Sequence, residues 1–128
     1  TAVASSVYKN DTLHNGAMYA VDSDVSTAWV AGDSLAWINV ELGQKETFSR
    51  LFIIAGENSI RKFTVEVEKN KLWMPVYESD ILPETNLNSF MGYGILDFNL
   101  PESVTVDHFR INILQSNNRP SIYTIRLK

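Results

Sequence analysis

Hydrophobic and polar residues alternate with a period of two along several short stretches of the chain. In Trp37–Leu42, the apolar residues Ile38, Val40 and Leu42 alternate with polar neighbours. Because successive side chains of a β-strand point to opposite faces, this pattern predicts a half-buried strand with these three residues inward. Arg50–Ala55 is apolar on both faces, which is typical of a central strand. The alternation recurs at Phe63–Glu68, His108–Ile113 and Tyr123–Leu127.

Turn-forming residues separate these predicted strands. The turn signals lie at Leu42–Gln44, Gly56–Asn58, Lys69–Lys71, Leu100–Glu102 and Ser116–Pro120. Helical periodicity is confined to Asn15–Val21, which supports about one or two turns. The pattern therefore predicts an all-β antiparallel β-sandwich of about five plus three strands, with less than about a tenth of the residues helical. No repeat or linker divides the chain, so we expect one domain over residues 1–128.

Composition agrees with one globular domain and excludes several classes of partner. The chain has 128 residues, 45% of them hydrophobic and 20% charged, which is enough to bury one core. Its net charge of −4 gives no attraction to nucleic acid or anionic lipid, and no apolar run is long enough to span a membrane. The absence of cysteine excludes disulfides and thiolate metal sites. Because the chain opens with Thr1 rather than Met, we expect a fragment of a longer protein.

Six short motifs carry a family resemblance. The segment Ala20–Trp29 resembles the signature A-x-D-G-D-x-x-T-x-W of coagulation factor V/VIII type C (discoidin-like) domains and family 32 carbohydrate-binding modules. Five further motifs similar to that family follow the same order: Ala4–Ser6, Trp37–Gly43, Ile60–Glu66, Val106–Ile111 and Ser121–Ile125. The resemblance covers the whole chain and implies a jelly-roll, galactose-binding-domain-like sandwich.

A narrower resemblance concerns the setting of the domain. Lys69–Trp73 and Pro120–Ile122 resemble segments of the C-terminal module of bacterial α-L-fucosidases. This implies a non-catalytic module beside a glycoside hydrolase in a bacterium, and therefore a secreted, periplasmic or cell-surface location. The expected partners are that parent catalytic domain and a glycan.

Oxygen-bearing residues cluster in the signature loop. Asp22, Asp24 and Thr27 place two carboxylates and a hydroxyl within six residues, which suits a hard cation such as Ca²⁺. The resemblance adds a carbonyl near Tyr19 and places Thr124 where the family often has a glutamate. We therefore predict a structural Ca²⁺ site. The alternative is that Asp22 and Thr27 hold the loop by hydrogen bonds alone.

Polar and aromatic residues of the predicted end loops suit sugar binding, which needs an aromatic face and a few planar polar groups. The predicted carbohydrate-binding residues are Asp33, Asn58, Arg61, Tyr93, Asn118 and Arg119. A shallow site of this kind binds weakly, with a Kd of about 0.1–1 mM. The resemblance implies terminal sugars of fucose- or galactose-containing glycans, although Val30–Ser34 lacks the histidine that often accompanies galactose binding in the family.

The remaining candidate residues favour structural roles. We expect Trp29 and Trp37 in the core, as the resemblance implies, and Trp73 at an edge of the sandwich. His14 and His108 fit neither a zinc site nor a Ser-His-Asp motif. Three functions stay open at this point: a carbohydrate-binding module, a structural or protein-interaction domain that braces a catalytic domain, and an independent enzyme. The first is the prediction.

Overall fold

The computed structural model describes residues 1–57, 59–82, 89–90, 93–117 and 119–128. Its strands are β1 (Ala2–Ala4), β2 (Trp29–Val30), β3 (Ala36–Gly56), β4 (Ile60–Lys69), β5 (Leu72–Glu78), β6 (Ser89–Phe90), β7 (Tyr93–Ser116) and β8 (Ser121–Leu127). Three short helical segments precede β2: η1 (Tyr8–Asn10), α1 (Thr12–Asn15) and η2 (Ala17–Ala20). The one or two helical turns predicted within Asn15–Val21 correspond to η2. No helix in the described parts of the chain has the length and apolar character needed to cross a membrane.

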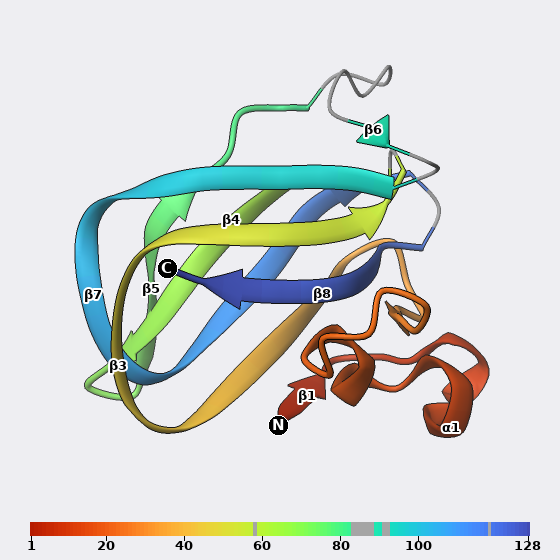
Figure 1. The fold of residues 1–128 in the computed structure, drawn as a ribbon, viewed down its shortest axis with the longest axis horizontal. Helices are drawn as coiled ribbons and strands as arrows, with labels where there is room; N and C mark the ends of the chain where they lie inside the picture. Colours follow the sequence, from red (N-terminus) through yellow and green to blue (C-terminus); the bar gives the residue numbers. More distant parts are fainter. Residues whose placement is uncertain (58, 83–88, 91–92, 118) are drawn as a thin grey trace.

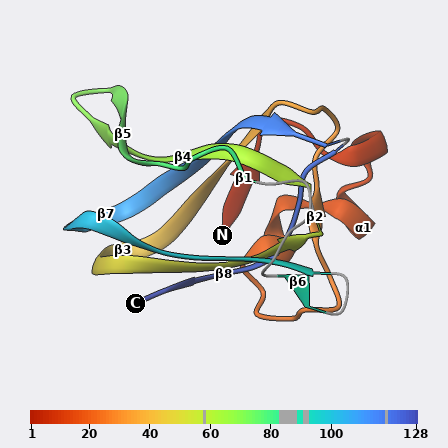
Figure 2. The same ribbon diagram turned by 90° about the horizontal axis from the view of Figure 1, so that it is seen from above.

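Two long strands, β3 and β7, build both layers of the sandwich. Residues 36–41 of β3 pair with 108–113 of β7, and residues 46–56 pair with 93–106. The first pairing continues on one side to β1 and on the other to β4 and β5, giving a five-stranded layer. The second continues to β8, giving a three-stranded layer with short β2 and β6 at its margins. Figure 2 shows the two layers joined where β3 and β7 bend. The five-plus-three antiparallel sandwich is confirmed.

The core lies between the layers and follows the predicted alternation. Ile38, Phe63, Phe109 and Ile111 are almost completely buried, and Phe48 packs against Phe109 with ring centroids 5.4 Å apart. Each such side chain contributes about 1.5–3 kcal/mol through burial. The core is thus formed by the residues whose alternation predicted it.

Three side chains lie differently from the expectation. Trp37 was expected in the core but is half-buried, because it alternates with the buried Ile38 and so faces outward from the five-stranded layer. Thr64 alternates onto the predicted wet face but is only 6% exposed. In β8, the alternating residues Tyr123, Ile125 and Leu127 are only half-buried, whereas Ile122 and Thr124 are fully buried, and a register shift separates the pairs Ile54–Thr124 and Ala55–Ile122.

The turn between β4 and β5 has an unusual backbone conformation. Asn70 and Lys71 have φ angles of 54° and 65°, and two successive residues of this kind form a type I′ hairpin turn. Asparagine tolerates this region, whereas lysine places its Cβ close to the following carbonyl.

We therefore expect Lys71→Gly to stabilise the domain by about 1 kcal/mol, because glycine adopts this conformation without the steric cost. Thermal unfolding measures the change. Lys69→Gly, at the strand end before the turn, serves as the control and should lower stability. A Lys71→Gly domain that melts no higher than the parent would contradict the turn assignment.

Candidate functional site

Several loops meet at the end of the sandwich opposite the bends of β3 and β7 (Figure 1). The Asn117 amide donates to the Ser59 carbonyl at 3.1 Å, and the Ala31 amide donates to the Pro120 carbonyl at 2.9 Å. The Ser116 hydroxyl donates to the Ser34 carbonyl. These bonds join three of the loops predicted to carry a binding site, because the strands that they follow end at the same pole.

A polar recess of about 240 Å³ opens between two of these loops, and its walls are Gly32, Asp33, Ser34 and Arg119. The Arg119 guanidinium carbon lies 4.4 Å above the centroid of the Tyr8 ring, a cation–π contact that orients the side chain. Among the described residues, no hydrogen bond or ion pair engages the Asp33 carboxylate or the Arg119 guanidinium. An acceptor and a planar donor are therefore open to a ligand.

Tyr8 reaches this recess through a close backbone contact that the sequence did not reveal. The Gly32 amide donates to the Ser6 hydroxyl at 3.0 Å. A Cβ atom on Gly32 would lie 3.1 Å from the Val7 carbonyl oxygen, so glycine permits the approach. The segment that carries Tyr8 is thereby held beside the recess. No periodic pattern marks this segment, and the partners that position it come from another loop.

Two other predicted binding residues, Arg61 and Tyr93, lie elsewhere at this pole. Arg61 Nε donates to the Leu82 carbonyl at 2.6 Å, and the Leu82 amide donates back to the Arg61 carbonyl at 2.7 Å. Arg61 is thus tied to the chain after β5 and does not line the recess. The Tyr93 hydroxyl donates to the Val25 carbonyl at 3.2 Å, which braces the signature loop. The predicted residues Asn58 and Asn118 lie outside the described residues.

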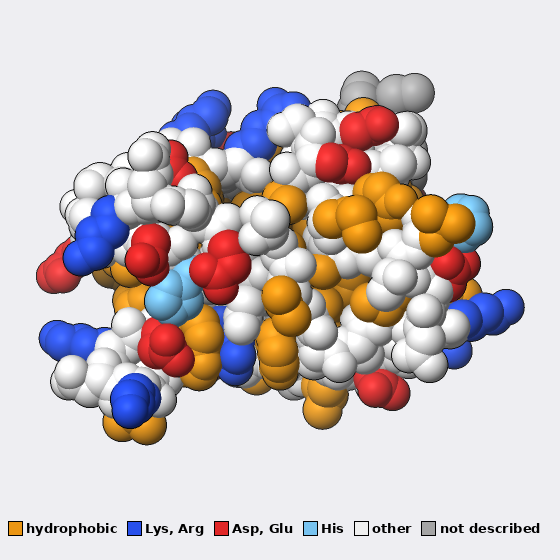
Figure 3. All heavy atoms as spheres, turned by 90° about the horizontal axis from the view of Figure 1, so that it is seen from below, with side chains coloured by type: hydrophobic (Ala, Val, Ile, Leu, Met, Phe, Trp, Pro, Cys, Tyr) orange, Lys and Arg blue, Asp and Glu red, His pale blue; other side chains and the backbone are white. Residues whose placement is uncertain are grey.

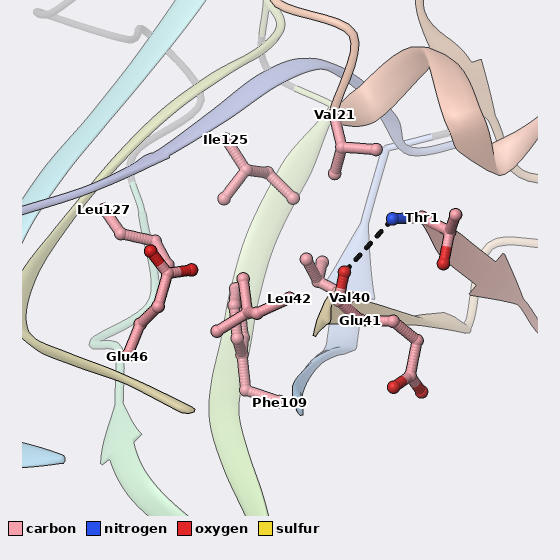
Figure 4. Close-up of a pocket in the computed structure, with 9 residues that line it drawn as sticks. All are labelled: Thr1, Val21, Val40, Glu41, Leu42, Glu46, Phe109, Ile125 and Leu127. Carbon is pink, nitrogen blue, oxygen red and sulfur yellow. Dashed lines mark hydrogen bonds between the residues drawn. The ribbon is translucent and has the colours of Figure 1, made fainter. Parts of the chain in front are cut away.

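A larger cavity of about 360 Å³ lies on another side of the molecule, between the edges of the two layers. Figure 4 shows its mixed lining, in which the apolar residues Val21, Val40, Leu42, Phe109, Ile125 and Leu127 lie beside the polar residues Thr1, Glu41 and Glu46. Hydrophobic side chains also reach the surface between charged ones on the face seen from below (Figure 3). The smaller recess combines an open planar donor with an open acceptor, which is the combination that a hydroxyl-bearing ligand needs.

The signature loop is closed by its own hydrogen bonds. Asp22 Oδ1 accepts from the Asp24 amide at 3.0 Å, and Asp22 Oδ2 accepts from the Thr27 hydroxyl at 2.6 Å. Asp24 Oδ1 accepts from the amide and hydroxyl of Ser26 at 2.9 and 2.6 Å, which lowers the pKa of Asp24. These bonds correspond to the alternative in which the loop holds without an ion.

The same loop also brings together oxygen ligands of the kind that Ca²⁺ prefers. Asp22, Asp24 and Thr27 lie within hydrogen-bonding range of one another. The predicted carbonyl ligand near Tyr19 or Ala20 would come from the end of η2, just before the loop. The buried Thr124 hydroxyl has no hydrogen-bond partner, and no contact described here links it to the loop. Within the described chain, no three acidic or histidine side chains gather as a metal site. The fit is partial, and Ca²⁺ binding stays a prediction.

Both histidines pair with carboxylates on the surface. His14 Nδ1 lies 2.8 Å from Asp11 Oδ2. His108 Nδ1 lies 2.6 Å from Asp107 Oδ1, and its Nε2 lies 3.2 Å from Glu68 Oε1. Neither imidazole is hydrogen-bonded to a serine hydroxyl in the part of the chain that the structure describes. These contacts do not form a nucleophile–base pair.

The sequence model of the F5/8 type C domain matches residues 1–126. The chain belongs to this family.

Solved structures similar to this F5/8 type C domain include chitosan-binding module 2, in complex with chitotriose, from a chitosanase/glucanase of Paenibacillus sp. IK-5. It is 17% identical with a TM-score of 0.76, and the match covers 99% of this chain and 94% of that one. The family 32 CBM of C. perfringens NanJ, in complex with galactose, is 19% identical with a TM-score of 0.78 over 99% and 91%. SpGH29 is 19% identical with a TM-score of 0.74 over 98% of this chain and 26% of that chain. No curated protein matches the sequence.

If the signature loop holds Ca²⁺, a chelator removes a ligand of the native state, and we expect EDTA to lower the melting temperature of the domain. A site filled at about 100 times its Kd adds about 2.7 kcal/mol to stability. Asp22→Asn keeps a hydrogen-bonding group but removes the charge, so its melting should not respond to EDTA. Parent melting curves that coincide with and without EDTA would show that hydrogen bonds alone hold the loop.

The His108 contacts predict a pH dependence of stability. The hydrogen bond to Asp107, followed by the one to Glu68, raises the pKa of His108 above its ordinary value of 6.5, against the opposing effect of burial. A pKa raised in the folded state adds stability that is complete below pH 6.5 and fades as the pH rises through the folded-state pKa.

We therefore expect the parent domain to lose stability from about pH 6 to about pH 8, and His108→Gln to remove that part of the slope. Thermal unfolding across this range measures both. His14→Gln controls for the loss of an exposed imidazole. Equal slopes for the parent and His108→Gln would contradict the assignment.

Proposed function

We propose that this F5/8 type C domain is a non-catalytic carbohydrate-binding module whose site is the recess at the loop pole. The observation that carries the proposal is the pair formed by Asp33 and Arg119, which line one recess without a hydrogen bond or ion pair to a described residue. Buried polar side chains normally satisfy each other, whereas exposed and uncommitted ones remain available for ligand hydroxyls.

The chemistry of the recess suits a sugar ring. The Arg119 guanidinium offers planar paired donors, and the Asp33 carboxylate offers acceptors, so that together they match the donor and acceptor character of adjacent hydroxyls. The Tyr8 ring, whose centroid lies 4.4 Å from the guanidinium carbon, holds the guanidinium in place. The recess is open, so few ligand atoms are enclosed. A few hydrogen bonds, each worth about 0.5–1.5 kcal/mol net, correspond to a Kd of about 0.1–1 mM.

Structural neighbours support the class of ligand. The Paenibacillus module was solved with chitotriose and the C. perfringens module with galactose, on the fold described above. Because these sequence identities are below 25%, they do not indicate which sugar this domain binds. We keep terminal sugars of fucose- or galactose-containing glycans as the first ligands to test.

A weak module acts usefully when it is tethered. Linkage to a catalytic domain raises the local concentration of that domain on its glycan without any new contact. In SpGH29, the matching part is 26% of the chain, so the same fold forms one part of a longer protein there. We propose a glycoside hydrolase, such as an α-L-fucosidase, as the parent enzyme and an extracytoplasmic bacterial location, where such glycans are met.

The recess can be tested by titrating the domain with galactose, chitotriose and a fucosylated trisaccharide, each to about 20 mM, while following backbone amide signals by NMR. We expect saturable shifts at Gly32, Ser34 and Arg119. Arg119→Ala and Asp33→Asn should each weaken binding by about fivefold or more, since each removes a hydrogen-bonding group. Arg126→Ala, an exposed arginine on β8, is the matched control and should bind as the parent does.

An absence of loop shifts with every sugar would contradict the proposal and favour the domain as a structural brace. Pull-down of a separately expressed catalytic domain would then be the relevant assay.

A further inference from the structure

A second polar and aromatic cluster lies on the outer face of the five-stranded layer, away from the loop recess. The guanidinium carbon of Arg110 lies 4.1 Å from the ring centroid of Trp37 and 4.2 Å from that of Trp73. The three side chains come from β7, β3 and β5. We call this set, Trp37, Arg110 and Trp73, the indole clamp. These two cation–π contacts hold the guanidinium in place.

One nitrogen of the clamped guanidinium is anchored, and two are open. Arg110 Nε donates to Asn39 Oδ1 at 2.6 Å, which sets the orientation of the guanidinium plane. No hydrogen bond or ion pair involves either Nη nitrogen among the described residues. The clamp therefore presents rigid, paired donors whose ordering has already been achieved in the free protein.

An oriented hydrogen-bond acceptor, the carboxylate of Glu66, lies on the strand next to Arg110. Glu66 is the register partner of Arg110 on β4. Its Oε2 accepts from the Thr64 hydroxyl at 2.6 Å and from Asn112 Nδ2 at 3.2 Å. Its Oε1 has no partner in the described chain, and no ion pair joins Glu66 to Arg110. Each group is held by neighbours of its own.

The geometry points to a second binding site, for an uncharged, hydroxyl-rich sugar unit, between Arg110 and Glu66 on the outer face of the five-stranded layer. An open donor pair beside an open acceptor matches adjacent sugar hydroxyls, and the half-buried indoles supply apolar surface. Glu66 and Glu68 lie close enough to Arg110 to act on its charge, and these two carboxylates disfavour an anionic ligand. The choice of a sugar rests on the proposed function.

Tryptophan signals make this site separable from the loop recess. The chain contains three tryptophans. Trp29 is fully buried and its indole N–H donates to the Ser6 carbonyl, whereas Trp37 and Trp73 are half-buried in the clamp. The three indole N–H signals thus provide two reporters at the clamp and one internal control in the core.

The experiment titrates the full chain with chitotriose, GalNAc-β-1,3-galactose and a fucosylated trisaccharide while following indole and backbone signals by NMR. We expect at least one sugar to shift the Trp37 and Trp73 signals saturably and to leave Trp29 unchanged. Arg110→Lys keeps the charge but loses the planar paired donors, and should weaken the indole response by about fivefold or more. The amide shifts at Gly32 serve as the readout of the loop recess.

Two further variants keep the result interpretable. Glu66→Gln retains an oxygen for Thr64 and Asn112 but loses the carboxylate, so it tests the acceptor if Arg110→Lys proves unstable in thermal unfolding. Arg119→Ala removes a wall of the loop recess and should leave the indole response intact.

Loop shifts without any response of Trp37 and Trp73 would overturn the second site and leave the proposed function standing. Indole shifts that disappear with Arg119→Ala would likewise overturn it, because they would report the loop site. An absence of shifts both at the two clamp indoles and at the loop recess would count against both proposals. A clamp that responds only to an added protein domain would also overturn the sugar assignment.

Discussion

The antiparallel pairing of β3 with β7 is the constraint on which the rest of the structure depends. Each strand is long enough to pass through both layers, and their register sets where the sandwich turns from one layer into the other. The remaining strands add to this pair: β4 and β8 hydrogen-bond to its two flanks, and β5 follows β4. The core is enclosed because the two strands bend together, which brings the apolar faces of their two parts opposite each other.

This arrangement of strands also explains where polar side chains are able to bind a ligand. Loops gather at the pole opposite the bends, and their backbone groups bind one another, as Asn117 does with Ser59. Side chains such as Asp33 and Arg119 are then left for other partners, because the loop shape does not need them. On the outer face of the five-stranded layer, register brings residues of three strands together around Arg110. In both places a rigid β-framework positions the polar groups.

Local pattern predicted the core well and the partners of surface residues poorly. The alternation around Ile38 and Phe109 identified buried faces because a strand has only two sides. For Trp37, the same alternation pointed outward, and the expectation taken from family resemblance was wrong. The partners of Arg110 and Tyr8 come from strands and loops distant in sequence, so they depend on register and loop path, which no local pattern encodes. The register shift beside Thr124 depends on how β8 pairs with β3, which the sequence of β8 alone does not indicate.

The edge strands of the sheet affect how neighbouring copies of this domain interact. β1, β2 and β6 are two or three residues long, and the longer edge strand β5 contains Pro75, which has no N–H to offer a neighbouring strand. Short edge strands and proline are the means by which β-proteins avoid edge-to-edge aggregation. Copies crowded along one polysaccharide would therefore be hindered from fusing into a continuous sheet through the five-stranded layer, whose edges are β1 and β5.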